Sequence, residues 1–128
     1  MSYYFGKKIN AAFDESVSKV TDELNKEGFG IITVIDVKET LKKKLDVDFR
    51  NYMILGACNP SFAYQALLAE DKIGTMLPCN VIVQELVPDE IEVAAIDPLA
   101  SMQAVDNPKQ AEGGDQVRVK LKTVIDSL

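Results

Sequence analysis

Two short segments of this chain are apolar at almost every position, and they constrain its fold more than any other feature. They span residues 29–35 and 52–57. A strand with one face in water alternates polar and apolar residues, whereas neither segment alternates cleanly. Both therefore read as strands that must be covered on both faces. Helices supply one cover, and either small inserted helices or a second subunit must supply the other, so we expect a homodimer.

The other elements are predicted from the spacing of apolar residues and from the glycine, proline and other turn-forming residues between them. Strands are expected at 3–9, 29–35, 52–57, 80–86 and 91–96, the last two forming a hairpin with a turn at 88–90. Helices are expected at 11–27, at 36–44, from Asn59 to about Gly74, and at 115–128, with a loop over 103–116. The result is a single domain, residues 1–128, of the α+β class. Its one antiparallel sheet has the order strand, helix, four strands, helix, with short helices inserted.

Three local patterns support these helices. In the first helix, apolar residues recur at steps of four, three and four: Phe13, Val17, Val20 and Leu24. The sequence Asp36-Val-Lys-Glu39 is a capping box, and Asn59-Pro60 combines a capping side chain with a proline that gives up no hydrogen bond. These patterns predict where the helices begin.

Composition excludes several functions. The chain has 128 residues and no histidine, which rules out His-based general bases, nucleophile pairs and metal ligands. A net charge of -6 and only two arginines disfavour nucleic acid and anionic membranes as partners. The first residues contain no apolar run after Lys7 and Lys8, so we expect a cytoplasmic protein with no membrane segment. No cofactor or metal is expected, since two cysteines leave a zinc site two ligands short.

The two cysteines lie beside asparagines. Cys58 directly precedes the helix start at Asn59, where free backbone N–H groups and the helix dipole lower the pKa of a thiol. Cys79 begins the next strand and is followed by Asn80. If strands 52–57 and 80–86 are antiparallel neighbours, the two sulfurs can meet; a parallel crossover would separate them. Cys58, Asn59, Cys79 and Asn80 are therefore the candidate ligand-binding residues, and the two thiols are the candidate catalytic groups.

Each of these residues also has a purely structural explanation. A free cysteine often packs as a small apolar side chain. Asn59 is explained by helix capping and Asn80 by turn chemistry. A purely structural role for these four residues therefore remains an alternative to the functional interpretation.

Several short motifs resemble those of a known family. They are Gly28-Phe29-Gly30, Asp36-Val37, Leu55-Gly56-Ala57-Cys58-Asn59-Pro60, Gly74, Leu77-Pro78-Cys79-Asn80 and Asp97-Pro98. In this order, over essentially the whole chain, they resemble the bacterial and archaeal family known as domain of unknown function 302. The resemblance implies a fold similar to one decorated copy of the TATA-box-binding-protein architecture, and a dimer. It implies no activity, and the acidic charge argues against DNA binding.

Three functions remain. The first is a dimeric binding module that holds a small ligand near the Cys58-Asn59 helix start. The second is a thiol-dependent redox protein or sensor, with Cys58 as the attacking thiol and Cys79 as the resolving thiol. The third is a structural dimer without a site. We favour the first.

Overall fold

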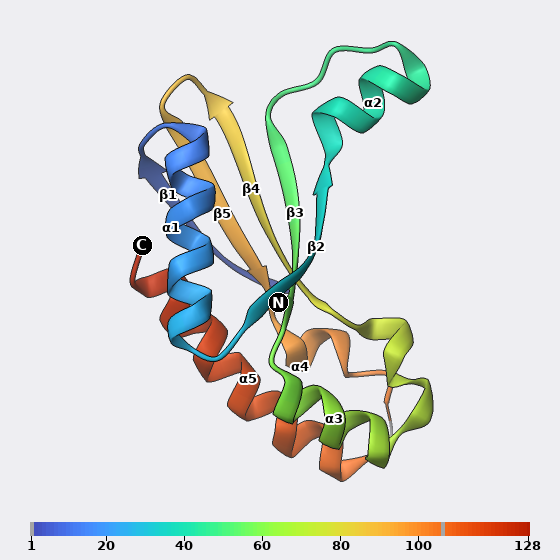
Figure 1. The fold of residues 1–128 in the computed structure, drawn as a ribbon. Helices are drawn as coiled ribbons and strands as arrows, with labels where there is room; N and C mark the ends of the chain where they lie inside the picture. The colour runs from blue at the N-terminus through green and yellow to red at the C-terminus, as the bar shows by residue number, and fades with distance from the viewer. Residues whose placement is uncertain (1, 106) are drawn as a thin grey trace.

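The computed structural model describes residues 2–105 and 107–128, which form one antiparallel five-stranded sheet with helices packed against it (Figure 1). The sheet has the order β1-β5-β4-β3-β2, and every neighbouring pair is antiparallel. The strands are β1 (Tyr4–Asn10), β2 (Gly30–Asp36), β3 (Tyr52–Cys58), β4 (Cys79–Val87) and β5 (Glu90–Ile96). The predicted α+β class with one antiparallel sheet is confirmed.

The helices lie on one face of the sheet and at its two ends. They are α1 (Phe13–Lys26), α2 (Val37–Leu45), α3 (Pro60–Ala69), the 3₁₀ helix η1 (Asp71–Met76), α4 (Pro98–Ser101) and α5 (Pro108–Asp126). Helix α2 lies beyond one end of the sheet, while α3, α4 and the first half of α5 gather at the other end (Figure 1). None of the helices in the described part of the chain is long and apolar enough to cross a membrane.

The core lies between the sheet and the two long helices. Val20 and Leu24 of α1 and Leu121 and Val124 of α5 are fully buried against the inward-facing side chains of the central strands. Those strand residues are Leu55, Ala57, Val81, Val83, Ile91, Val93 and Ala95. The spacing that predicted α1 therefore marks its buried face, since Phe13 and Val17 also pack against this core.

Strand β2 departs from the expectation that both of its faces are covered. Its side chains remain exposed, with Ile32 at 61%, Val34 at 59% and Ile35 at 47%. The reason is its place in the sheet: β2 is an edge strand and pairs only with β3. The expectation is wrong for β2 within one chain. Segment 52–57 is a central strand, and there Leu55 and Ala57 are buried while Ile54 is half-buried.

Two helix boundaries also differ from expectation. The segment 103–116 was expected to be a loop, but α5 already begins at Pro108; residue 106 lies outside the described residues. Gly114 is tolerated inside α5 because a Cβ there would approach Leu99 Cδ2 at 3.3 Å, so glycine lets α5 pack closely on α4. The helix expected to run to Gly74 ends at Ala69, where the backbone of Glu70 becomes extended and η1 follows.

Helix α3 is tied to α5 by side-chain amides. Gln110 Nε2 donates to the backbone oxygen of Ala66 at 2.8 Å, and Asn107 Nδ2 donates to that of Ala69 at 3.0 Å. Ala66 O also accepts a bond from the backbone N–H of Glu70 at 2.9 Å, so the Gln110 bond is a second one to that carbonyl group. The two amide bonds join the C-terminal end of α3 to the start of α5.

Candidate functional site

A cavity of about 750 Å³ opens at the end of the sheet where α3, α4 and α5 meet. Its described lining comes from the ends of β3 and β4, from α3, from the segment around Leu77, and from α4 and the first half of α5. It exists because α3 rests on α5 rather than on the strands. Cys58, Asn59 and Cys79 all line it, so three of the four candidate residues share one cavity.

The sheet register brings the two cysteines together. Strands β3 and β4 are antiparallel neighbours, and Ala57 pairs directly with Cys79. Cys58 follows Ala57, so both cysteines lie at the same end of the sheet. The prediction that these strands are antiparallel neighbours is confirmed. Both cysteines are free thiols.

The environment of Cys79 suppresses its ionisation. Burial, and to a smaller extent the neighbouring Cys58 thiol, raises the pKa of Cys79 to about 11. A thiolate in an apolar site loses the hydration that stabilises its charge. Cys79 is therefore a thiol, and a poor nucleophile, at neutral pH.

We expect the Cys79 thiol to react with iodoacetamide about a hundredfold more slowly in the native protein than in the urea-unfolded chain at pH 8. The reason is that the thiolate reacts and a rise of about two pKa units removes most of it. Mass spectrometry of the two cysteine peptides over time measures both rates in wild-type protein. Cys79 keeps its proton to a higher pH in the folded chain than in the unfolded chain. The two alkylation rates should therefore approach each other as the pH rises toward about 11. Equal rates at pH 8 would contradict this.

Asn59 has a different role from the capping that sequence analysis offered. Its side chain makes no capping bond to α3; instead Nδ2 donates to the backbone oxygen of Glu27 at 3.4 Å. Gly28 makes this approach possible, since its φ of +86° is left-handed and a Cβ there would lie 3.1 Å from Asn59 Nδ2. Asn59 thus links the end of α1 to the start of α3.

Asn80 is separated from the other three candidates. It is exposed and does not line the large cavity. It borders a smaller hollow of about 250 Å³ on the other side of the segment from Leu77 to Cys79. The structure therefore brings Cys58, Asn59 and Cys79 together and leaves Asn80 apart.

Several lining residues were missed by sequence analysis. Met102 follows α4, and Gln110 and Gly113 belong to the first turns of α5. Gln110 and Gly113 fall in the segment 103–116 that was expected to be a loop, and Met102 directly precedes it. The signal that could have placed them is Asn107-Pro108, which repeats the asparagine-proline pattern found at the start of α3.

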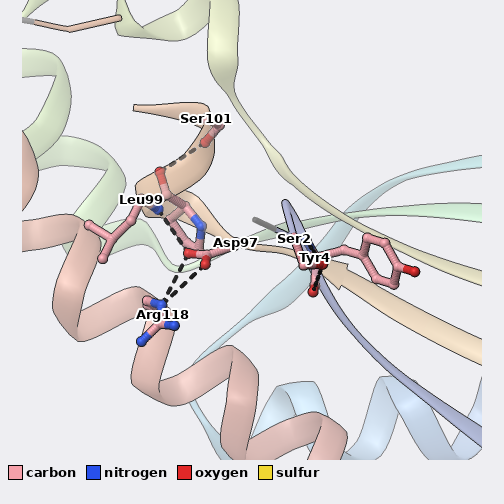
Figure 2. A network of polar contacts seen from close by, with 7 residues as sticks. Ser2, Tyr4, Asp97, Leu99, Ser101 and Arg118 are labelled. Carbon is pink, nitrogen blue, oxygen red and sulfur yellow. Dashed lines mark hydrogen bonds and ion pairs between the residues drawn. The ribbon is translucent and has the colours of Figure 1, made fainter. Parts of the chain in front are cut away.

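An ion pair holds the α4 wall of the cavity against α5 (Figure 2). Both carboxylate oxygens of Asp97 lie 3.2 Å from Arg118 Nε, and Oδ1 also accepts a bond from the backbone N–H of Leu99 at 3.0 Å. Asp97 thereby caps α4 and anchors it to α5. The Arg118 guanidinium also lies over the Phe5 ring, 5.1 Å from its centroid.

The site has few groups for a metal or a charged cofactor. Among the described residues there is no cluster of three or more cysteine or carboxylate side chains that could hold a metal ion. The described lining carries thiols and side-chain amides as its polar groups. The chemistry it offers is therefore apolar contact, hydrogen bonding through amides, and reaction at sulfur.

Comparison with known proteins agrees with this fold. The sequence model of the family described as Domain of unknown function DUF302 matches residues 5–128. The structure is similar to the crystal structure of an uncharacterized conserved DUF302 protein from Bacillus stearothermophilus, with a TM-score of 0.89, 23% sequence identity, and coverage of 98% of each chain. At this identity the likeness shows the shared fold. No curated protein matches the chain.

Proposed function

The chain belongs to the family described as Domain of unknown function DUF302, as its motifs predicted, and we propose that it acts as a dimeric small-ligand-binding module. The ligand occupies the cavity beside Cys58 and Asn59. We place the protein in the cytoplasm, where both cysteines stay reduced, and we propose neither nucleic acid nor membrane as a partner, given the net charge of -6.

The observation that carries this proposal is the cavity itself. Its volume of about 750 Å³ lies within the range of small-molecule sites, roughly 300–1,000 Å³. Apolar side chains dominate its described lining, and Cys58 and Asn59 stand among them with a few more polar groups. That combination of an apolar wall and a few convergent polar groups is typical of binding sites.

A thiol-dependent function is the second candidate, because the two cysteines share the cavity. In that function the Cys58 thiolate attacks a disulfide substrate and displaces one of its two thiolates. Cys79 then attacks Cys58 in the mixed disulfide and displaces the second thiolate, so that the substrate is reduced to two thiols and a Cys58–Cys79 disulfide forms. The raised pKa of Cys79 weakens this candidate, since the resolving step also needs a thiolate. Ligand binding requires no ionised cysteine and is therefore preferred.

The second subunit is proposed to cover the face of the sheet opposite α1 and α5. One row of apolar residues crosses that face through paired positions: Ile35, Ile54, Ile82 and Ala94. Ile35 is exposed and the other three are half-buried. In a chain with net charge -6, an uncharged row is where two identical surfaces can meet without repulsion. The same contact would cover exposed β2.

Native mass spectrometry of freshly purified protein tests the proposal. We expect the mass of two chains plus a retained small molecule that collisional activation releases. Cys58→Phe is expected to abolish retention because the larger side chain enters the cavity, whereas Cys58→Ser keeps the size of the side chain and should retain the molecule. Wild-type protein without added mass, or equal retention in Cys58→Phe, would contradict ligand binding at this site.

The same spectra separate the alternatives. Loss of the retained mass in Cys58→Ser as well as in Cys58→Phe would favour the thiol-dependent function. Ile35→Glu places a charge in the apolar row and should yield single chains. Val119→Glu is the matched control, since Val119 is 64% exposed on α5, away from that row, and this variant should remain dimeric.

A further inference from the structure

The cavity is free of charge along its described lining. Charged residues make up 27% of the chain, yet none is found among the described residues that line the cavity. The polar side chains there are those of Asn59, Gln65, Gln110 and Gln116, together with the two thiols. Among the described lining residues, a bound charged group would therefore find no ion-pair partner to offset its lost hydration.

Two of the amide side chains that line the cavity already make hydrogen bonds within the protein. Gln110 is buried, and its Nε2 donates to Ala66 O in α3. Asn59 Nδ2 donates to Glu27 O. To turn to an anionic ligand, either donor would have to give up its present hydrogen bond to a backbone oxygen. The amides therefore shape the cavity rather than offer it strong anion contacts.

The mouth of the cavity is also apolar. Ile32 and Leu68 line the cavity and yet expose 61% and 65% of their surface, and Leu67, which also lines it, is 43% exposed. A molecule entering from water would first meet these side chains. Apolar surface that is both exposed and continuous with a cavity favours a ligand that gains by leaving water.

We infer that the cavity binds neutral, mainly apolar small molecules and discriminates against anionic ones of the same shape. This inference rests on the proposed function and adds the chemical class of the ligand. An unpaired charge loses its hydration in such a site, and a few extra apolar contacts do not offset that loss. Discrimination against charge is therefore its distinguishing property.

Three matched fluorescent probes test this inference on the full-length protein. N-phenyl-1-naphthylamine is neutral, 8-anilinonaphthalene-1-sulfonate adds an anionic group to the same rings, and the corresponding sulfonamide adds a neutral group of similar size. Fluorescence titration at constant ionic strength should show that the two neutral probes bind about tenfold or more tightly than the sulfonate. Equal or tighter binding of the sulfonate would overturn the inference.

Variants at Gly113 show whether the probes occupy this cavity. Gly113 lines it, and a Cβ added there meets no atom within 4 Å, so a larger side chain can grow into open space. Gly113→Phe should weaken the neutral probes about tenfold or more. Val119→Phe is the matched control, since it places the same side chain on α5 at a residue that is 64% exposed and does not line the cavity, and this variant should bind as wild type does.

The outcomes distinguish a failure of the inferred ligand class from a failure of the proposed binding site. If the sulfonate binds best and Gly113→Phe abolishes its binding, the cavity is a binding site but the inferred ligand class is wrong. If no probe distinguishes Gly113→Phe from Val119→Phe, the proposed site itself fails, and the inference fails with it. A circular dichroism melt of each variant shows that a loss of binding is not a loss of fold.

Discussion

Gly56→Ala is expected to destabilise the protein by about 3 kcal/mol, although it adds a single methyl group. Gly56 lies in β3, and a Cβ there would collide with Thr33 Oγ1 on β2 and come within 2.8 Å of Pro78 Cγ. Thr33 Oγ1 can rotate away about χ1, but the Pro78 ring is rigid and Thr33 Cβ lies 3.3 Å from the added Cβ, so β3 or the segment at Pro78 must shift to relieve the contact. Urea denaturation followed by circular dichroism measures the lost free energy of unfolding.

Two further variants identify the cause of this loss. Gly30→Ala is the matched control in the neighbouring strand, where an added Cβ meets nothing within 4 Å, and it should change stability by less than about 1 kcal/mol. Thr33→Ala in the Gly56→Ala background removes one of the two obstructing groups and should restore part of the stability. If Gly56→Ala and Gly30→Ala unfold at the same urea concentration, Gly56 does not serve this close packing.

The positions of the strands along the chain and the buried face of α1 could be predicted because they depend on local patterns, whereas the pairing of β1 with β5 could not. Phe13, Val17, Val20 and Leu24 all contact the core, since a helix repeats its buried face along the sequence. Asp36 accepts a bond from the backbone N–H of Glu39 at 3.0 Å, as the capping box predicted. Such interactions span three or four residues and can be read without knowing the fold.

Coverage of the strands could not be predicted in the same way. Residues 29–35 and 52–57 are equally apolar, yet β2 is exposed and β3 is central. Whether a strand lies at an edge depends on pairing with distant strands, which composition does not report. The exposed apolar surface of β2 is what led us to retain a second subunit in the proposal.

The start of α5 was missed because two signals conflict. Asn59-Pro60, Asp97-Pro98 and Asn107-Pro108 each stand where a helix begins. At the third of these, Gly113-Gly114 follows and favours a loop by helix propensity. In the structure the helix continues through both glycines, and Gly114 is buried where a Cβ would lie 3.3 Å from Leu99 Cδ2. The local sequence does not report such packing, and α5 supplies five of the described residues that line the cavity.

The site was only partly predictable for the same reason. Cys58 and Cys79 come together through antiparallel pairing, which the order of the strands already implied. Gln110 and Gly113 reach the cavity only because α5 crosses the end of the sheet beneath α3. Sequence distance gives no indication of that crossing. The sequence therefore predicted the cavity residues that lie near a motif, but it did not predict those that helix packing brings to the cavity.

Asp97→Ala is expected to cost about 2–3 kcal/mol of stability and to weaken binding of N-phenyl-1-naphthylamine. The change removes the cap of α4, worth about 1 kcal/mol, and leaves the Arg118 guanidinium without its carboxylate. The Arg118 side chain is 39% exposed, so solvent screens part of that loss. Because α4 carries Pro98, which lines the cavity, loosening α4 should disturb the site as well. Urea denaturation and probe titration give the two quantities.

Asp97→Asn separates the cap from the ion pair. Its side-chain oxygen can still accept from the backbone N–H of Leu99, but it carries no charge for Arg118. It should therefore retain about 1 kcal/mol of the stability that Asp97→Ala loses. Combining Asp97→Ala with Arg118→Met closes a double-mutant cycle, and we expect a coupling energy of about 1 kcal/mol between the two charges. If the two single variants add without coupling, the cap alone orders this wall, and the ion pair in Figure 2 contributes nothing to the cavity.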